Sequence, residues 1–189
     1  PTADDCVLIS GAGGAVGTIA GQIAKLSGAR VVGIVGSQAK ADWLCNTLGY
    51  DAAVVRSGDT PLTEAIGEVC PDGVDVFFDN VGGQTLEAVI SNMNHRGRLA
   101  LCGAISGYGV TPHGPSNLFE LVTKELSVEG FMTHFRHDRY DEAREQLSQW
   151  LRDGIIQSPE HRLEGIENVG KAFADLFAGE NFGKTIVAL

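Results

Sequence analysis

Four of the seven residues from position 11 to position 17 are glycines: Gly11, Gly13, Gly14 and Gly17. An apolar run precedes this turn, and apolar residues at helical spacing follow it. Glycines in such a turn let the backbone approach a pyrophosphate, and the helix N-terminus offers free N–H groups to the phosphates. In the strict G-x-G-x-x-G frame the first position is Ala12, so an ordinary glycine-rich loop is an equally good interpretation of the motif alone.

Three more segments of the same character follow later strands in the sequence. They are 36–37, 79–83 and 103–108, each rich in glycine and small polar residues. The carboxyl ends of parallel strands meet at one rim of a sheet, where ligands bind in folds of this kind. Together with the 11–17 turn, these segments favour a binding site over four unrelated turns.

The residues at the end of the second expected strand indicate whether a domain of this kind binds NAD or NADP(H). A domain that binds NAD usually carries Asp or Glu there, to accept hydrogen bonds from the ribose hydroxyls. This chain has Ser37 at that place, with Lys40 one helical turn later and Arg56 after the third strand. Such groups can bind a 2′-phosphate, which an acid would repel, so we expect NADP(H) rather than NAD. The alternative is that Lys40 and Arg56 are solvated surface cations.

Alternating strands and helices must position these segments. This order predicts an α/β fold with a doubly wound, mostly parallel sheet of six or seven strands in a single domain, 1–189. The expected strands cover 7–9, 30–35, 52–55, 74–78, 97–102, 126–131 and 184–188. Helices are expected after the glycine turn and at 39–48, 61–69, 84–92, 117–125, 138–153 and 165–177, with a loop at 111–115.

Composition excludes several classes of protein. The net charge of −10 argues against nonspecific nucleic-acid binding, which needs clustered Lys and Arg. An apolar run of membrane-spanning length is absent from the sequence, and the four cysteines form no C-x-x-C pair, so we expect reduced thiols in the cytoplasm. His134 and His137 form an H-x-x-H, but no nearby Cys or carboxylate completes a plausible set of metal ligands, which favours a polar turn over a metal site.

Six motifs taken together resemble the cofactor domain of the zinc-independent medium-chain reductases, in the branch of prostaglandin and alkenal double-bond reductases. They are G-A-G-G-A-V-G, G-Q-I-A-K, G-S-x-x-K, D-N-V-G-G, C-G-A-I-S-x-Y and N-F-G-K-T-I-V. The resemblance covers nearly the whole chain. It implies NADPH as the cofactor and reduction of the carbon–carbon double bond of α,β-unsaturated ketones and aldehydes.

The resemblance also implies a role for particular residues. The pyrophosphate would lie at Gly14, Ala15 and Val16, within the turn bounded by Gly11 and Gly17. The 2′-phosphate would lie at Ser37 and Lys40, with Arg56 as a further cation. The nicotinamide half would lie beside Asn80, Cys102, Gly103, Ala104, Ile105 and Ser106, with Asn181 also near the cofactor.

Tyr108 is the candidate catalytic residue. Hydride addition to the β carbon of an enone leaves an enolate, which needs charge stabilisation and then a proton. Tyr108 is the titratable side chain of the glycine-rich loop after the fifth expected strand, and the resemblance puts it near the nicotinamide ribose. The alternative is an aromatic side chain that packs over the cofactor as a lid.

The chain departs from the family pattern in three places. The family commonly has Ala at the positions of Gly11 and Gly13, and Tyr at the position of Arg56. Family members also carry a preceding β-rich, GroES-like domain that forms the other wall of the substrate cleft, so we expect this chain to be an excised cofactor domain. The expected partners are that domain, a small enone or enal substrate, and a second copy of the chain in a homodimer.

The sequence lacks the residues that two other classes of dehydrogenase require. A short-chain dehydrogenase needs Tyr-x-x-x-Lys, but Tyr140 is followed by Arg144 and Tyr108 by Pro112. A zinc alcohol dehydrogenase needs Cys and His ligands that this sequence lacks. A reductase of the quinone oxidoreductase type, and an NADPH-binding or sensing module without catalysis, remain as alternatives.

Overall fold

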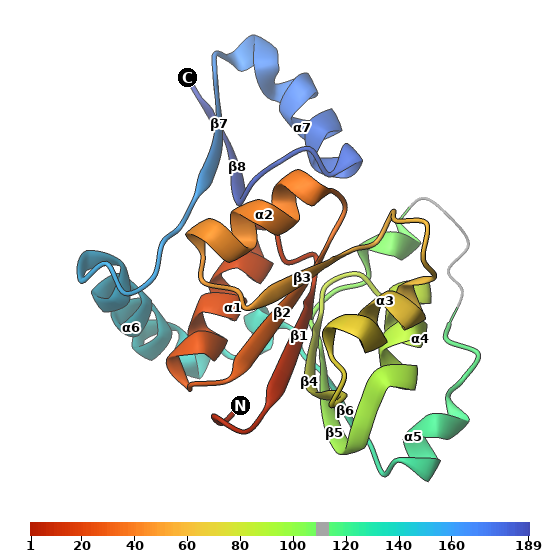
Figure 1. The fold of residues 1–189 in the computed structure, drawn as a ribbon. Helices are drawn as coiled ribbons and strands as arrows, with labels where there is room; N and C mark the ends of the chain where they lie inside the picture. Colours follow the sequence, from red (N-terminus) through yellow and green to blue (C-terminus); the bar gives the residue numbers. More distant parts are fainter. Residues whose placement is uncertain (109–113) are drawn as a thin grey trace.

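The computed structural model describes residues 1–108 and 114–189, and its main feature is a parallel six-stranded sheet (Figure 1). The strand order is β3-β2-β1-β4-β5-β6, and every neighbouring pair is parallel. The strands are β1 (Cys6–Ser10), β2 (Arg30–Val35), β3 (Ala52–Val55), β4 (Val74–Asp79), β5 (Met93–Leu101) and β6 (Ser127–Gly130). The predicted doubly wound α/β fold is therefore confirmed, with the glycine turn at the switch point between β1 and β4.

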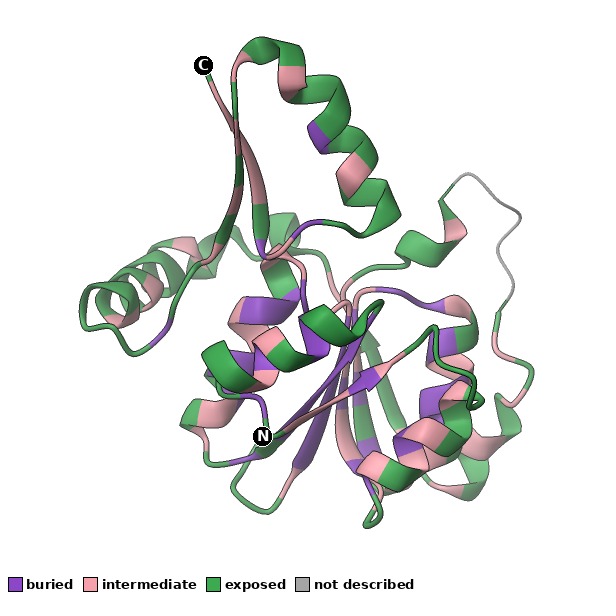
Figure 2. Ribbon diagram, turned by 45° about the horizontal axis from the view of Figure 1, so that its top comes forward, coloured by how far each residue is buried: buried purple, intermediate pink, exposed green. Residues whose placement is uncertain are grey.

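Helices cover both faces of this sheet (Figure 1). On one face lie α1 (Ala15–Leu26) and α2 (Gln38–Thr47), and on the other lie α3 (Leu62–Val69) and α4 (Gly83–Asn92). Each pair of helices has its own buried cluster, centred on Leu44 on the first face and on Ile66 and Val89 on the second. Buried residues accordingly concentrate on the central strands and the helix faces turned toward them (Figure 2).

The C-terminal part of the chain forms a second unit. After α6 (Tyr140–Arg152), the strands β7 (Glu160–Glu164) and β8 (Lys184–Ala188) pair in a separate parallel two-stranded sheet, and α7 (Val169–Ala178) connects them. In Figure 1 this unit stands above the main sheet, and Figure 2 shows that most of its residues are exposed or half-buried. The expected last strand therefore exists, but it does not extend the main sheet.

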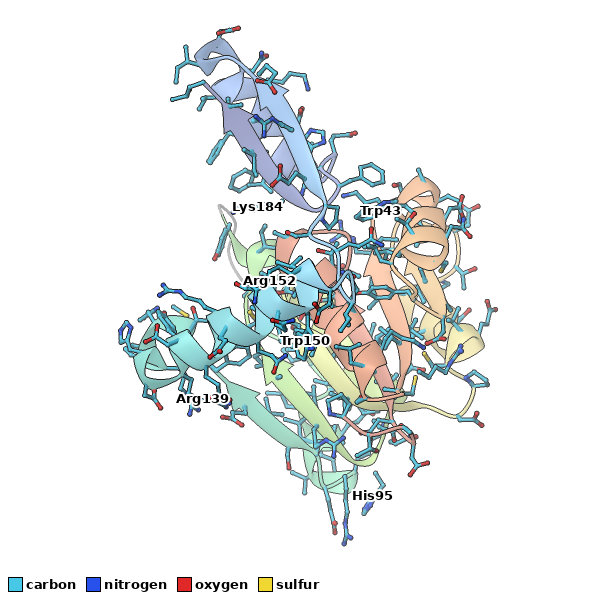
Figure 3. All side chains as sticks on the ribbon, turned by 90° about the vertical axis from the view of Figure 1, so that its left-hand side faces the viewer. Trp43, His95, Arg139, Trp150, Arg152 and Lys184 are labelled. Atoms are coloured by element: carbon cyan, nitrogen blue, oxygen red, sulfur yellow. The ribbon has the colours of Figure 1, made fainter. Side chains whose placement is uncertain are left out.

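Contacts with the glycine turn and with α2 hold this unit against the main domain. The N–H of Gly183 donates to the carbonyl of Gly13 at 2.8 Å. The Phe182 ring packs edge-on against Trp43 of α2, with ring centroids 5.1 Å apart. In Figure 3 Trp43 lies beside the base of the β7–β8 sheet, where Lys184 begins β8. The C-terminal segment thus borders the rim of the main sheet.

The other differences from the expected elements are local. β5 begins at Met93, four residues before the expected start, with an irregular register against β4 between Val74 and Val76. The helix expected at 117–125 is reduced to α5 (Phe119–Thr123), and the expected loop at 111–115 lies partly outside the described residues. Short 3₁₀ turns occur at η1 (Ile105–Gly107), η2 (Thr133–Phe135), η3 (His137–Arg139) and η4 (Ile166–Asn168). Among the described residues, no helix is both long enough and apolar enough to span a bilayer.

Candidate functional site

The glycine turn between β1 and α1 depends on close packing of backbone against backbone. Gly11 has a φ of +58°, a conformation that favours glycine. A Cβ on Gly17 would lie 2.5 Å from the carbonyl oxygen of Gly11 and 2.6 Å from the Cα of Ala12. Tyr50, which is buried, donates its hydroxyl to the carbonyl of Gly17 at 2.7 Å. The first turn of α1 is therefore held tightly against the chain that leaves β1.

The N-terminus of α1 has the features of an anion site. Gly14 is the N-cap residue and has no side chain to bond the first backbone N–H groups of the helix. In the described structure, the first turn of α1 contains no acidic side chain. The N–H groups of Ala15, Val16 and Gly17 precede the first intrahelical hydrogen bond, which Thr18 donates to Gly14 at 3.0 Å. These groups, with the positive end of the helix dipole, fit a phosphate.

The predicted 2′-phosphate residues lie on both sides of the end of β2. Ser37 is the exposed N-cap residue of α2. Arg56 follows β3, and its N–H donates to the carbonyl of Val35, the last residue of β2, at 2.8 Å. Neighbouring strand ends therefore bring Ser37 and Arg56 into adjacent loops. Among the described residues, α2 has no acidic side chain in its first turn that would repel an anion.

Lys40, the third residue predicted at the 2′-phosphate, lies between the glycine turn and the C-terminal segment. Its side chain is only 7% exposed, and a Cβ on Gly13 would lie 3.1 Å from its Cδ. The ammonium Nζ donates to the carbonyl of Gly179 at 2.7 Å and lies 5.5 Å from the centre of the Phe182 ring. Burial lowers the pKa of Lys40, and the negative charge of Glu180 opposes this shift. An ammonium has three donors, so the bond to Gly179 leaves two for an anion.

A buried hydrogen-bond network joins the ends of β1 and β4, and the sequence analysis did not assign it a role. Asp79 accepts bonds from the Ser10 hydroxyl at 2.6 Å and from the N–H of Val81 at 2.9 Å. Asn80 donates its side-chain amide to the carbonyl of Ser10 at 2.8 Å. The signal was the D-N-V-G-G motif at a strand end, but only the fold pairs it with Ser10. The network fixes the two central strands at the switch point.

The loop after β5 packs against the loop after β4. The N–H groups of Cys102 and Gly103 both donate to the carbonyl of Asp79, at 2.8 and 3.0 Å. The Ser106 hydroxyl donates to the carbonyl of Val81 at 2.6 Å. Burial raises the pKa of the Cys102 thiol, and the Asp79 charge acts in the same direction, so Cys102 favours its neutral form. Ala104 and Ile105 complete this segment, where η1 begins.

A cleft of about 1580 Å³ opens beside this loop. Tyr108 lines the cleft together with Phe135 and Arg136, which come from the segment after β6. The Tyr108 residue is 67% exposed. Of the predicted site residues, the cleft brings together Arg56, Cys102, Gly103, Ala104, Ser106 and Tyr108. The described lining does not include Gly11, Gly14, Ala15, Val16, Gly17, Ser37, Lys40, Asn80, Ile105 or Asn181, which lie along the rest of the rim or behind it.

Asn181 lies in the segment that borders the glycine turn. It is buried, and its side-chain amide donates to the carbonyl of Gly183 at 2.9 Å. Gly183 has a φ of +72°, and a Cβ there would lie 2.2 Å from the carbonyl oxygen of Pro159. Asn181 therefore shapes a turn that only glycine can complete, next to Gly13 and Gly14.

No group of three or more His, Cys, Asp or Glu that could hold a metal ion occurs in the part of the chain that the structure describes. His134 lies within η2 and His137 begins η3, where the rings of His137 and Tyr140 pack together with centroids 5.1 Å apart. The predicted site residues contribute backbone N–H groups, hydroxyls, amides, a thiol and cations.

A doubly wound parallel sheet with a glycine turn at its switch point and an uncapped helix N-terminus beyond it defines a dinucleotide-binding fold. A family model described as "Zinc-binding dehydrogenase" matches residues 15–149. The chain belongs to this family, and it corresponds to the cofactor-binding part of a medium-chain dehydrogenase/reductase, with relatives named prostaglandin reductase and 2-alkenal reductase. The resemblance read from the motifs is confirmed.

The chain is similar in sequence to two named reductases. It is 44% identical over 186 residues to prostaglandin reductase 1 of Bos taurus, covering 97% of this chain and 56% of the relative. It is 38% identical over 188 residues to a 2-alkenal reductase (NADP(+)-dependent) of Nicotiana tabacum, covering 99% and 55%. The chain therefore spans about half the length of the curated relatives it matches.

Solved structures show the same fold. The structure of CurA in complex with NADPH from Vibrio vulnificus superposes with a TM-score of 0.91 at 37% identity, covering 100% of this chain and 58% of that one. An Escherichia coli quinone oxidoreductase complexed with NADPH superposes with a TM-score of 0.82 at 25% identity, with the same coverage of 100% and 58%.

Proposed function

We propose that this chain binds NADPH along the carboxyl rim of its main sheet and presents it to a substrate in the cleft beside Tyr108. The N-terminus of α1 is the observation that carries the proposal. Its N-cap residue is Gly14, and Gly17 in its first turn packs against the backbone of Gly11 and Ala12. Its free N–H groups would bind the pyrophosphate. Relatives named for NADP dependence, and a similar structure that contains NADPH, support the same cofactor.

The 2′-phosphate would lie at the end of β2. Ser37 offers an exposed hydroxyl, Lys40 an ammonium with two remaining donors, and Arg56 a guanidinium on the adjacent loop. An acid in this place would instead favour the ribose hydroxyls of NAD. The nicotinamide half would lie at the cleft, beside the loop from Cys102 to Ser106, which hydrogen bonds to Asp79 and Val81 hold in place. Asn80, which donates to Ser10, lies next to this loop but outside the described cleft lining. Bound NADPH supplies a hydride, and the chain's residues hold and orient it.

In the whole protein, the reaction we propose is reduction of the carbon–carbon double bond of an α,β-unsaturated ketone or aldehyde. The names of the two reductases and the aromatic and apolar side chains around the cleft support this substrate class. Tyr108 would hydrogen-bond the developing enolate oxygen or supply the proton, directly or through a ribose hydroxyl or water. The completing β-rich domain, a homodimer and a cytoplasmic location remain predictions.

Reduction of a quinone is the second candidate, favoured by the similarity to a quinone oxidoreductase structure. A third is an NADPH-binding module without chemistry of its own. The second and third candidates use the same cofactor site as the first. They differ from it only in which substrate, if any, is reduced.

Two measurements test the proposal. Titration of the purified protein with NADPH and NADH should show tighter binding of NADPH, because NADH lacks the 2′-phosphate; equal affinities would contradict the cofactor assignment. Turnover of the full-length protein with a simple alkenone and with a simple quinone then separates the reactions. Turnover with the alkenone supports double-bond reduction, turnover with the quinone alone supports the second candidate, and binding without turnover supports the third.

A further inference from the structure

Two cysteines meet at the end of the main sheet opposite the cleft. Cys6 is the first residue of β1, and Cys70 directly follows α3, 64 residues later. Their sulfur atoms share a hydrogen bond at 3.8 Å, and the two residues are 9% and 3% exposed. The proposed cofactor site does not use either thiol. In Figure 1 this end of the sheet is the one near the N-terminus.

A small cavity gives access to the pair. It has a volume of about 150 Å³ and is lined by both cysteines together with Arg30, Asp72 and Asp75, among others. One water molecule occupies about 30 Å³ in the liquid, so the cavity has room for hydrogen peroxide, a molecule not much larger. The lining thus combines charged side chains with both thiols. A small polar oxidant can therefore reach sulfur atoms that a bulky reagent cannot.

The surroundings give the two thiols different roles. The hydrogen bond with Cys70 lowers the pKa of Cys6; burial and the Asp75 charge oppose this shift, and the Arg30 cation supports it. The same hydrogen bond and burial raise the pKa of Cys70. The thiolate is the reactive form of cysteine, and Cys6 pairs directly with the Arg30 cation in the register of β1 and β2. This position assigns Cys6 as the nucleophile and Cys70 as the thiol that follows. Arg30 is held in place by its bond to the carbonyl of Val69 at 2.9 Å.

We propose that Cys6 and Cys70 form a dithiol oxidation site that hydrogen peroxide converts into an intramolecular disulfide. The Cys6 thiolate attacks one peroxide oxygen, the O–O bond breaks, and the departing hydroxide takes a proton to leave as water. This step gives a sulfenic acid at Cys6. Cys70 then attacks the Cys6 sulfur and displaces a second water, with loss of its own proton. Two thiols are oxidised by two electrons, and one peroxide is reduced to two waters.

The geometry allows this bond to form. A disulfide bond is about 2.0 Å long, so the sulfurs must approach by about 1.8 Å from their present 3.8 Å. Cys70 begins the short connection to β4, where Gly73 has a φ of +83° and donates its N–H to the carbonyl of Cys70 at 2.9 Å. The disulfide would join the start of β1 to the end of α3. It would close a loop that contains the glycine turn and raise the melting temperature.

The experiment is graded peroxide treatment of the purified protein, followed by blocking of free thiols and peptide mapping by mass spectrometry. We expect a cross-link between the peptides that contain Cys6 and Cys70, at peroxide concentrations that leave Cys45 and Cys102 free. The number of titratable thiols in denaturant should fall from four to two. Dithiothreitol should restore all four. These readouts need no cofactor, so they stand or fall independently of the proposed function.

Variants separate the two steps. Cys70→Ser should accumulate sulfenic acid at Cys6, trapped by a dimedone-type reagent, because the second thiol is missing. Cys6→Ser should abolish the cross-link and leave Cys70 unmodified. The control Cys45→Ser/Cys102→Ser should still cross-link. Over-oxidation of Cys6 without a cross-link, or reaction of Cys45 or Cys102 before this pair, would overturn the proposal. Both outcomes are measured by peptide mapping of the unsubstituted protein, so the test does not depend on the folding of any variant.

Discussion

Lys40 is a buried cation whose ammonium group already binds the carbonyl of Gly179. A side chain in this position is held beside the glycine turn instead of moving freely in solvent, so little conformational entropy is lost when it binds an anion. This is the physical argument for Lys40 over an exposed lysine as a ligand of the 2′-phosphate. It also explains why a substitution here affects both binding and packing.

We predict that Lys40→Ala weakens NADPH binding roughly 10- to 150-fold, because a charged hydrogen bond is worth about 1.5–3 kcal/mol. NADH binding should change little, since NADH has no 2′-phosphate. Fluorescence titration of both cofactors measures this difference. Lys171→Ala, on the exposed side of α7, is the matched control and should leave both affinities unchanged. An equal loss for the two cofactors would show that Lys40 acts through packing alone.

Tyr108 is exposed at the cleft, where a phenol hydroxyl can reach a bound substrate. In the full-length enzyme we predict that Tyr108→Phe lowers kcat well beyond twofold while the NADPH dissociation constant stays the same, because the hydroxyl acts on the enolate and not on the cofactor phosphates. Steady-state kinetics with an alkenone, combined with a cofactor titration, measures both. Tyr140→Phe on α6 removes an equivalent hydroxyl away from the cleft as a control. A normal kcat in Tyr108→Phe would remove this residue from the mechanism.

The turn between β1 and α1 is so closely packed that it has no room for an additional side-chain atom at Gly17. Gly17 is closed in by the backbone of Gly11 and Ala12, which cannot move without opening the turn. We predict that Gly17→Ala lowers the free energy of unfolding by about 1–3 kcal/mol and weakens NADPH binding. Gly170→Ala in α7 is the same substitution in open space and should be neutral or stabilising by at most about 1 kcal/mol. Denaturant unfolding of the two variants compares them, and equal effects would contradict the steric argument.

Asp51 connects α1 to β2 through its carboxylate. It accepts bonds from Lys25 at 2.8 and 2.9 Å and from the N–H of Val31 at 2.6 Å. Burial alone would raise the pKa of Asp51, but these hydrogen bonds and the Lys25 charge outweigh it and lower the pKa. A carboxylate with a depressed folded-state pKa stabilises the fold above its unfolded pKa of about 3.9, and this stabilisation is lost as the pH falls through the folded-state value.

We therefore predict that Asp51→Asn lowers the free energy of unfolding at pH 7 by about 1–2 kcal/mol. The difference from the unsubstituted protein should shrink as the pH falls below about 4, since protonation removes the same charge. Urea unfolding at a series of pH values measures it. Asp4→Asn, at an exposed position near the N-terminus, should have little effect at any pH. A difference that persists unchanged in acid would indicate lost packing instead of lost charge.

In the proposed function, residues 1–189 form one side of the substrate site. Tyr108 and Phe135 border the cleft at 67% and 75% exposure, and the chain spans about half the length of its curated relatives. Hydride transfer needs donor and acceptor held in a near-attack geometry and shielded from water, which can lower the barrier by roughly 7–11 kcal/mol. A cofactor bound on one open wall lacks that positioning.

We predict that a protein consisting of residues 1–189 binds NADPH but does not oxidise it with a simple alkenone at an enzymatic rate. Enhancement of NADPH fluorescence measures binding, and the decay of its absorbance measures turnover. The full-length protein under the same conditions is the control for active substrate and cofactor. Brisk turnover by residues 1–189 would show that this chain, alone or as a dimer, builds a complete substrate site.

The sequence by itself determined the order of strands and helices in the main sheet, the parallel direction of its strands and the position of the glycine turn. These follow from local patterns: apolar runs, helical spacing and glycines such as Gly17 that tolerate close approach. It also placed Tyr108, Cys102 and Arg56 at one rim, because parallel strands end together. The strand β7 was missed, since its sequence EHRLE is mostly polar and gives no strand signal without its partner β8.

Only the tertiary structure decided which distant residues touch. The bond of Lys40 to Gly179 spans 139 residues, that of Ser10 to Asp79 spans 69, and the contact of Cys6 with Cys70 spans 64. Each depends on how separate elements pack, and no periodicity along the chain encodes such a pairing. A local pattern can specify an element and the end at which its side chains emerge, whereas the neighbours of those side chains are fixed by the packing of the whole fold.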